Sequence, residues 1–332
     1  MDNFFIHFVL CNITIGLFVL ILLCMKRIFK HCLTPRMQFN LWIPFTISLL
    51  VPFLPVSFST LSTKMQDLFH PLAHFSHTVH TTNTSEYTSS STNQIYDYAI
   101  SMRTQFPVYI STIFCVIWGI GMFVMLFSFV RSLVLLHHMR RTANLMQDKR
   151  IHAIYMTCLS ELQLRKSIPL YSSSIIDTPV STGILRPAIF LPLHHISNFE
   201  EQEIRYILLH ELMHCYYKDA IFNYCMNIIR ILYWFHPLIW LITKEFYTER
   251  ELACDTSVLR LLGANEQISY GVTLLHFVDK QTNTPLSLLN NLSENAKQMK
   301  RRILNIKQHQ PLTIQKKLHS ILSFLLSLLV IL

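Results

Sequence analysis

Four long apolar blocks separate more polar stretches of the chain. They cover residues 4–25, 41–58, 106–130 and 318–332. The first three are at or near the ~20 residues needed to cross the hydrocarbon layer of a bilayer, so the pattern predicts three membrane spans. The fourth block has no charged residue but stops short of that length. We expect it to be the start of a fourth span, left by truncation or by a natural short form.

The loops between these blocks orient the spans. Lys26, Arg27, Lys30 and Arg36 lie between the first two blocks with no acidic residue among them, which is typical of a cytoplasmic loop. The N-terminus is therefore predicted outside, residues 59–105 as an extracellular loop and residues 131–317 as a cytoplasmic domain. The first block lacks the basic start and small-residue cleavage site of a signal peptide, so we expect it to remain in the mature protein.

Composition and charge support a membrane protein. Hydrophobic residues make up 51% and charged residues 14% of the chain, which excludes an ordinary soluble domain. The net charge of +9 lies largely beside the ends of the spans, so we expect membrane lipids and no direct nucleic-acid partner. The 8 cysteines include no C-x-x-C pair, and all fall in spans or on the predicted cytoplasmic side. A disulfide framework is therefore not expected.

The predicted cytoplasmic domain begins with apolar residues at helical spacing over 132–164. Residues 168–192 are rich in β-branched residues and interrupted by proline and glycine, which predicts a small, irregular β-sheet. A second helical pattern starts at Asn198, a suitable N-cap, and has glutamates in its first turn. This domain is thus predicted to be α+β, with a long helix after the sheet.

The second helical pattern carries His210, Glu211 and His214 in the arrangement H-E-x-x-H. Two histidines four apart share one face of a helix and can bind one zinc ion, while the glutamate between them acts as general base. A zinc ion lowers the pKa of a bound water and polarises a carbonyl, so this pattern predicts peptide hydrolysis. This chemistry requires the motif to lie on a helix, since only then do the two histidines share one face.

A catalytic zinc ion usually takes three protein ligands, and Glu251 is our predicted third. Glu251 and Asp255 are four apart in a segment free of Gly and Pro, so both acids share one helical face. Glu251 would bind the metal. Asp255 would either join it or accept the free N–H of a ligand histidine and so fix its tautomer.

The apolar stretch 220–243 separates the two motifs and looks like another span. If it crossed the bilayer, Glu251 would emerge about 30 Å from His210, and the two could not share a zinc ion. We therefore predict a bent or re-entrant helical pair at the membrane face, turning near His236 and Pro237.

The chain resembles the transmembrane zinc peptidases of the bacterial β-lactam sensor-transducer family, the BlaR/MecR type. The resemblance covers nearly the whole chain and rests on HELMH at 210–214, KD at 218–219, WFHP at 234–237 and RELACD at 250–255. It implies an α-helical polytopic membrane protein with a cytoplasmic, gluzincin-like α+β zinc protease domain. It also implies cleavage of a cytoplasmic transcriptional repressor, which induces antibiotic-resistance genes, and self-cleavage before the fourth span. Here that bond would fall within 290–303, with Arg301 and Arg302 as one candidate.

In that family a penicillin-binding sensor domain follows the fourth span. This chain contains no S-x-x-K, so the acylating serine is not in it. Two alternatives stay open: a membrane zinc protease of the same fold with other substrates, such as damaged membrane proteins, and a truncated, non-catalytic receptor remnant. A homodimer is possible under each reading.

Other residues near the motifs have two interpretations each. His236 either stabilises an oxyanion or caps the turn before Pro237, and we favour the cap. For Asp219 we favour a role at a helix end over one beside the metal ligands. Arg230 is expected to snorkel to the membrane interface, and Cys215 and Cys254 to pack. We expect the substrate to add as a strand along an exposed sheet edge at residues 188–191.

Overall fold

The protein is described from a computed structural model of the 332-residue chain. The structure describes residues 2–29, 33–50, 108–164, 167–174, 176–192, 196, 199–282 and 292–309. The chain divides into two compact units, Met1–Gly16 with Ile47–Gly121, and Leu17–Thr46 with Met122–Leu332. The described part of the first unit consists of helix segments alone, and all the chemistry discussed below lies in the second.

Helices occupy most of the described residues of the first three apolar blocks and of the segment between the first two. They are α1 (Asp2–Phe29), α2 (Pro35–Asn40), α3 (Trp42–Leu50) and α6 (Val108–Thr142). Among the described residues one helix, Thr112–Thr142, is long and apolar enough to cross a membrane by length and composition, with a mean hydropathy of 2.5. None of its most apolar window is buried inside the protein. The predicted loop at 59–105 and the predicted fourth span at 318–332 lie outside the described residues.

A four-stranded sheet follows α6, in the spatial order β1-β2-β4-β3. β2 (Leu170–Ser173) and β4 (Ala188–Pro192) pair in parallel, whereas β1 (Asn144–Leu145) and β3 (Val180–Thr182) pair antiparallel at the two edges. All five residues of β4 are buried, as expected for an inner strand. The predicted small sheet at 168–192 is therefore present, and β1 adds a strand that the helical spacing concealed.

The predicted continuous helix over 132–164 is wrong. α6 ends at Thr142, β1 follows, and a new helix, α7 (Lys149–Glu161), starts after the N-cap Asp148. The Asp148 carboxylate accepts hydrogen bonds from the backbone N–H groups of Arg150 and Ile151, at 2.8 and 3.3 Å. Such a cap starts a helix independently of the apolar spacing, which here continued across the break.

α9 (Glu201–Tyr216) is the helix that carries the H-E-x-x-H motif. Asn198, the predicted N-cap, lies outside the described residues, and Glu200 holds the N-cap position instead. Glu203 reaches back to accept from the Glu200 backbone N–H at 3.0 Å. The helix packs on α7, and its apolar face is buried in the main core of the second unit. This core holds the motif in place because almost every residue of α9 from Ile204 to Met213 is buried.

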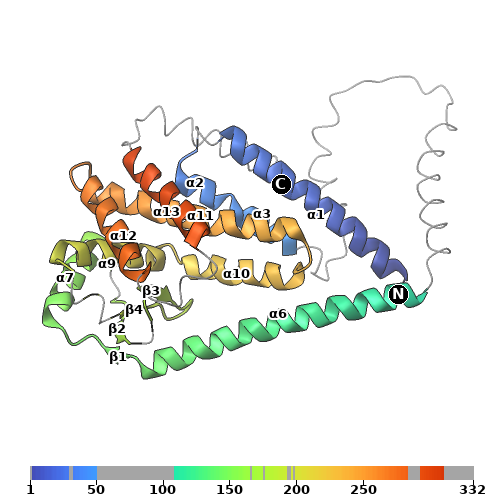
Figure 1. Ribbon diagram of the computed structural model, residues 1–332, viewed down its shortest axis with the longest axis horizontal. Helices are drawn as coiled ribbons and strands as arrows, with labels where there is room; N and C mark the ends of the chain where they lie inside the picture. Colours follow the sequence, from blue (N-terminus) through green and yellow to red (C-terminus); the bar gives the residue numbers. More distant parts are fainter. Residues whose placement is uncertain are drawn as a thin grey trace, which may run out of the picture. The chain divides into compact units, whose positions relative to one another are not determined.

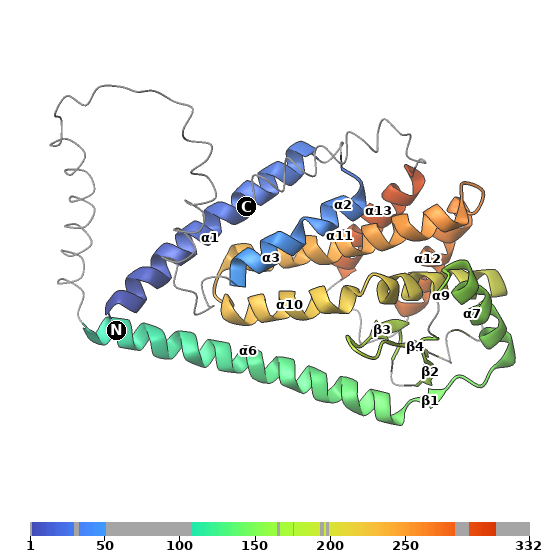
Figure 2. The ribbon, with the colours of Figure 1, turned by 180° about the vertical axis from the view of Figure 1, so that it is seen from behind.

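Two helices then form the hairpin that the sequence predicts. α10 (Asp219–Leu232) runs to a short turn, and α11 (Pro237–Leu262) returns beside it, as Figures 1 and 2 show from opposite sides. His236 is the N-cap residue of α11 and Pro237 its first residue, so the turn lies where we expected it. Two further helices, α12 (Gln267–Thr282) and α13 (Leu292–Lys307), complete the described domain and pack on each other and on α9 and α11.

Candidate metal centre

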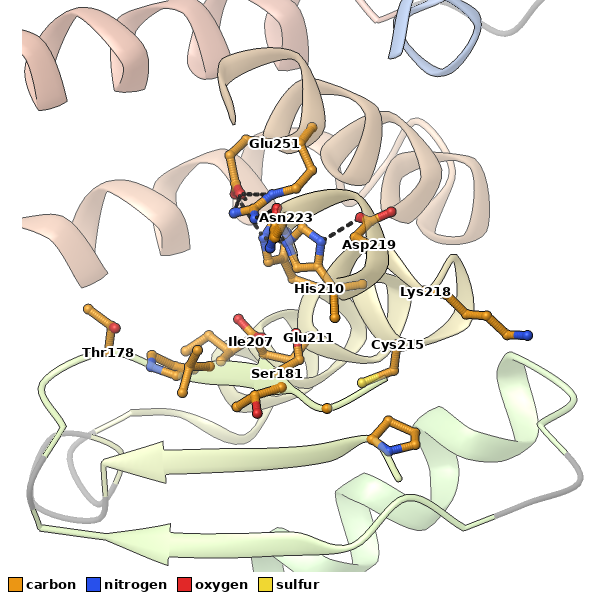
Figure 3. A pocket seen from close by; sticks show the side chains of 18 of the residues that line it. Thr178, Ser181, Ile207, His210, Glu211, Cys215, Lys218, Asp219, Asn223 and Glu251 are labelled. Carbon is orange, nitrogen blue, oxygen red and sulfur yellow. Dashed lines mark hydrogen bonds and ion pairs between the residues drawn. The ribbon is translucent and has the colours of Figure 1, made fainter. Parts of the chain in front are cut away.

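A cavity of about 790 Å³ opens between the motif helix and the edge strand β3. Figure 3 shows His210, Glu211 and Cys215 from α9 on one side and Thr178 and Ser181 facing them. Further walls come from α10, α11 and α13. The cavity thus brings together elements that are more than a hundred residues apart in sequence. His210, Glu211 and His214 of the predicted H-E-x-x-H motif all line it.

The two imidazoles of the motif point their Nε2 atoms at each other and at Glu251. The His210 and His214 Nε2 atoms are 3.2 Å apart. Glu251 Oε2 lies 3.3 Å from His210 Nε2, and Glu251 Oε1 lies 3.8 Å from His214 Nε2. The structure therefore brings the three predicted ligands to one point, although α9 and α11 are separate helices.

The far side of the His210 ring fixes its tautomer. His210 Nδ1 lies 3.0 Å from the Tyr270 hydroxyl, and that hydroxyl donates its one hydrogen to Asp255 Oδ1 at 2.7 Å. The tyrosine oxygen can then only accept from the ring, so His210 Nδ1 carries the proton and Nε2 keeps its lone pair. Asp255, which we predicted to accept from a ligand histidine, is 3.4 Å from Nδ1 and acts through Tyr270.

His214 is oriented by Asp219. Its Nδ1 donates to Asp219 Oδ2 at 2.8 Å, which again leaves Nε2 free on the side of Glu251. Asp219 is the first residue of α10 and is only 2% exposed. The helix-end role that we favoured for Asp219 is confirmed, and the same carboxylate also has the other role, since it holds a motif histidine. Carboxylates in this position raise the basicity of a ligand imidazole.

Arg36 lies on the other side of Asp219. Its Nη2 is 3.6 Å from Asp219 Oδ1, and its guanidinium stacks on the ring of Tyr217 at 3.4 Å from the ring centre. α2, which carries Arg36, thus contacts the residue that orients His214. Sequence reasoning used Arg36 only as a topology signal.

Glu251 is held by the residue before it. Arg250 donates to Glu251 Oε1 through Nε at 3.1 Å and through Nη2 at 2.6 Å, and its Nη1 donates to Asn223 Oδ1 at 2.7 Å. Burial alone would raise the pKa of Glu251, but Arg250, with His210, His214 and Arg302 adding to its effect, holds that pKa well below its usual range. The carboxylate is therefore ionised and its Oε2 faces the histidines.

The same charges act on the histidines. Burial alone would lower the pKa of His214, but the opposing effects of Cys254, Asp219 and Glu251 outweigh it and raise that pKa to about 10. The pKa of His210 is also raised, against the effect of burial. Both imidazoles therefore favour a cation, either a proton or a metal, at the shared point.

These distances fit a zinc ion. Zinc–nitrogen and zinc–oxygen bonds of 2.0–2.2 Å in a tetrahedron place neighbouring ligand atoms roughly 3.4 Å apart. The separations of 3.2, 3.3 and 3.8 Å lie around that value. Two imidazole Nε2 atoms, once they have given up their protons, and one ionised carboxylate are also the donor types that zinc takes in catalytic sites.

Cys254 offers a competing third donor. Suitable donor atoms of His210, His214 and Cys254 lie within 4.8 Å of one another. However, Cys254 Sγ is 3.5 Å from His210 Nδ1 and 3.4 Å from the His210 carbonyl oxygen, on the side of the ring already used by Tyr270. One imidazole cannot present Nδ1 and Nε2 to the same ion. The facing Nε2 pair therefore favours Glu251, and Cys254 packs in the core, as we expected, with His210 among its contacts.

Other predictions have mixed outcomes. His236 holds the N-cap position of α11, as favoured, while Arg230 lies 4.6 Å from the centre of the Trp240 ring, a contact that the snorkelling interpretation did not include. The substrate edge at 188–191 is wrong, because these residues form the inner strand β4. The edge strand beside the motif is β3. The sequence did not predict this, because two of its three residues are small and polar, Ser181 and Thr182.

The structure also describes Arg301 and Arg302, the pair predicted as one candidate for self-cleavage. Arg301 and Arg302 lie within α13, a continuous helix. Arg302 is directed inward, where its Nε and Nη2 bind Asp255 at 2.8 Å each. A protease cuts an extended backbone, so the bond between these arginines is protected while α13 stays folded.

A buried ion pair fixes α11 next to Glu251. Lys26, at the end of α1, pairs with Glu249, and Trp42 Nε1 donates to the same Glu249 oxygen at 2.7 Å. All three side chains are nearly inaccessible. A buried charge without a partner is strongly destabilising, so this contact ties α11 to α1 and α3 two residues before Glu251.

Comparisons with known proteins agree with the motif. A family profile described as BlaR1 peptidase M56 matches residues 6–306. The chain belongs to this family. It is 30% identical over 330 residues to the regulatory protein BlaR1 of Bacillus licheniformis, covering 98% of this chain and 55% of that protein.

More distant relatives of the family include the methicillin resistance mecR1 protein of Staphylococcus aureus, 26% identical over 72% of this chain and 40% of that protein. The regulatory protein BlaR1 of Staphylococcus aureus is 24% identical over 87% of this chain and 48% of that protein. The chain therefore spans about half the length of the curated relatives that it matches.

Proposed function

We propose that this M56-family chain is a multi-pass membrane zinc metalloprotease of a β-lactam-responsive signalling system. It would cleave itself and a cytoplasmic transcriptional repressor and so induce antibiotic-resistance genes. The observation that carries the proposal is the convergence of His210 Nε2, His214 Nε2 and the Glu251 carboxylate within 3.8 Å. The signalling role rests on relatives whose names describe regulation and methicillin resistance.

His210, His214 and Glu251 would hold the zinc ion, which, when bound, supplies a Lewis acid for water and the scissile carbonyl. Asp219 and the Tyr270–Asp255 pair keep the two imidazoles in the tautomer that binds metal. Arg250 keeps one Glu251 oxygen occupied and leaves the other for the metal.

Glu211 would be the general base. It is buried at 8% exposure and lines the same cavity as both histidines, and in the H-E-x-x-H arrangement this glutamate acts on the metal-bound water. It takes a proton from the attacking water and passes it to the leaving amine nitrogen when the peptide C–N bond breaks. The amine fragment then leaves neutral, the other fragment leaves with a new carboxyl group that contains the water oxygen, and Glu211 returns to its ionised state.

The substrate would enter as an extended strand along β3. Val180, Ser181 and Thr182 form the cavity wall opposite α9, and β3 has β4 on one side only. A peptide added to the free edge gains backbone hydrogen bonds whatever its side chains are. This edge replaces the inner strand that the sequence had suggested.

The proposed membrane arrangement follows the charge pattern. Residues 1–130 would contain three spans and the extracellular loop at 59–105, residues 131–317 the cytoplasmic gluzincin-like protease domain, and residues 318–332 the start of a fourth span. The exposed apolar surface of Thr112–Thr142 supports a lipid-facing helix, with Arg140 and Arg141 at its end. The α10–α11 pair would lie against the inner membrane face.

Replacing Glu211 with Gln tests the chemistry. The purified chain should keep its bound zinc because no metal ligand is lost, while cleavage of a candidate repressor should fall by at least about a thousandfold. The matched control is Glu201→Gln, an exposed first-turn glutamate of the same helix, which should cleave normally. Cleavage by the Glu211→Gln variant at the wild-type rate would contradict the assignment.

The same assay separates the alternatives. A protease with other substrates would bind zinc and cleave a generic unfolded peptide but spare the repressor. A non-catalytic remnant would bind zinc and cleave neither.

A further inference from the structure

The last described helix, α13, is an integral wall of the cavity. Met299 and Arg302 line it, while Ile306 is buried in the same core as the motif helix. Asn305 donates to Thr256 Oγ1 of α11 at 3.2 Å, and the Gln267 side chain of α12 donates to the Ile306 carbonyl. Gly271 of α12 faces Ile306 and Ile303 of α13, which lie 3.5 and 4.0 Å from the place a Cβ would take. α13 is thus docked by contacts along its length.

Arg302 is the residue that α13 contributes to the metal centre. Its Nε and Nη2 each donate to one oxygen of Asp255 at 2.8 Å, a two-pronged arrangement typical of strong arginine–carboxylate pairs. Its Nη1 lies 3.5 Å from Glu251 Oε2, the oxygen that faces His210. The side chain is 12% exposed and Asp255 is fully buried.

Asp255 connects Arg302 to His210, one of the proposed zinc ligands, through Tyr270. Its Oδ1 accepts from Tyr270 as well as from Arg302, and Tyr270 accepts from His210 Nδ1. Both oxygens of Asp255 thus accept hydrogen bonds, Oδ1 from Tyr270 and Arg302 and Oδ2 from Arg302. Arg302, Asp255, Tyr270 and His210 therefore form one chain of hydrogen bonds that runs through α13, α11, α12 and α9.

We propose that Arg302 is a positioning residue of the metal centre, a role that rests on the proposed zinc site. Its guanidinium fixes Asp255, which fixes the Tyr270 hydroxyl and so the His210 ring, and it keeps Asp255 from competing with Glu251 for the metal. Docking of α13 thereby sets the affinity of the site for zinc.

Loss of the guanidinium would leave a fully buried carboxylate without its cation. Asp255 would then take up a proton or turn toward the nearest other cation, which is the metal or a protonated His210. Either change breaks the orientation of His210. Removing residues that orient ligand histidines typically weakens metal affinity about tenfold to a hundredfold.

Arg301 provides a matched control. It is the neighbouring residue on the same helix, but its Nη1 binds Glu245 at 2.9 Å and its side chain is 38% exposed. Successive residues on a helix point about 100° apart, so the two arginines have different partners on α11. A general effect of losing one positive charge from α13 would be the same at both positions.

The test compares zinc affinity in the full chain purified in detergent. Affinity is measured by competition with a fluorescent chelator for Arg302→Met, Arg302→Lys, Arg301→Met and the wild type, with thermal unfolding followed alongside. We expect Arg302→Met to bind zinc about tenfold to a hundredfold more weakly, Arg302→Lys to recover part of the loss, and Arg301→Met to match the wild type. Wild-type affinity in a folded Arg302→Met variant would overturn the proposal.

Tyr270→Phe keeps the arginine–aspartate pair and removes only its link to His210, so it decides the case if Arg302→Met fails to fold. It should weaken zinc binding with little change in thermal stability, and unchanged affinity would again overturn the proposal. If the wild type itself binds no zinc, the proposed function fails instead, which distinguishes the two failures.

Discussion

At the scale of single residues, the proposed metal centre depends on two histidines whose Nδ1 atoms both have hydrogen-bond partners. Asp219 holds His214, and Tyr270 holds His210. The motif itself and Glu251 could be predicted from spacing, since helical geometry determines which side chains share a face. Tyr270 and Arg302 could not, because they approach from α12 and α13 and no local pattern relates them to His210. Asp219 follows His214 by five residues, but an acidic residue in the first turn of a helix is common and does not by itself indicate a contact with His214.

The charges at the site predict that zinc binding releases protons. Since the pKa of His214 is raised to about 10 without metal, this histidine carries a proton at neutral pH that zinc must displace from Nε2. Zinc affinity should therefore rise with pH between 6 and 8, by about tenfold per pH unit for each proton released. Isothermal titration in two buffers of different ionisation enthalpy measures the number directly. Equal affinity at both ends of this range would contradict the assignment.

At the scale of elements, the hairpin of α10 and α11 is the feature that the sequence predicted best. A simple distance argument required the chain to turn back near Pro237, and Glu251 indeed lies 3.3 Å from His210. The sheet was predicted less well. β-branched residues located it, but strand order depends on pairings between distant segments, so the inner position of β4 was not predictable.

The edge strand yields a test of substrate binding. Ser181→Pro removes a backbone N–H from β3 and stiffens it, so an added substrate strand would lose a hydrogen bond. We expect KM for the repressor to rise about tenfold with bound zinc unchanged. The control is Leu145→Pro in β1, the other edge of the same sheet, which lies away from the cavity. Equal effects of the two prolines would show sheet damage rather than lost substrate contact.

At the scale of the whole molecule, the second unit joins α1 and α2 to the helices of the proposed protease site through charged contacts. Lys26 of α1 binds Glu249, and Arg36 of α2 lies against Asp219. Each basic residue was read from the sequence only as a marker of the cytoplasmic side. Their buried partners give them a second role, since helices α10 and α11 carry residues that hold or supply the metal ligands. Family membership fits this arrangement, because the match extends from residue 6 to residue 306 and includes the apolar helices.

The central claim is that one zinc ion is bound by His210, His214 and Glu251. The most direct measurement is the zinc content per chain of the intact purified protein, compared between Glu251→Ala and Cys254→Ala, the two rival third ligands three residues apart. We predict one zinc per wild-type chain, one in Cys254→Ala, and a loss of most of the metal in Glu251→Ala. No zinc in the wild type, or zinc kept by Glu251→Ala and lost by Cys254→Ala, would contradict the account.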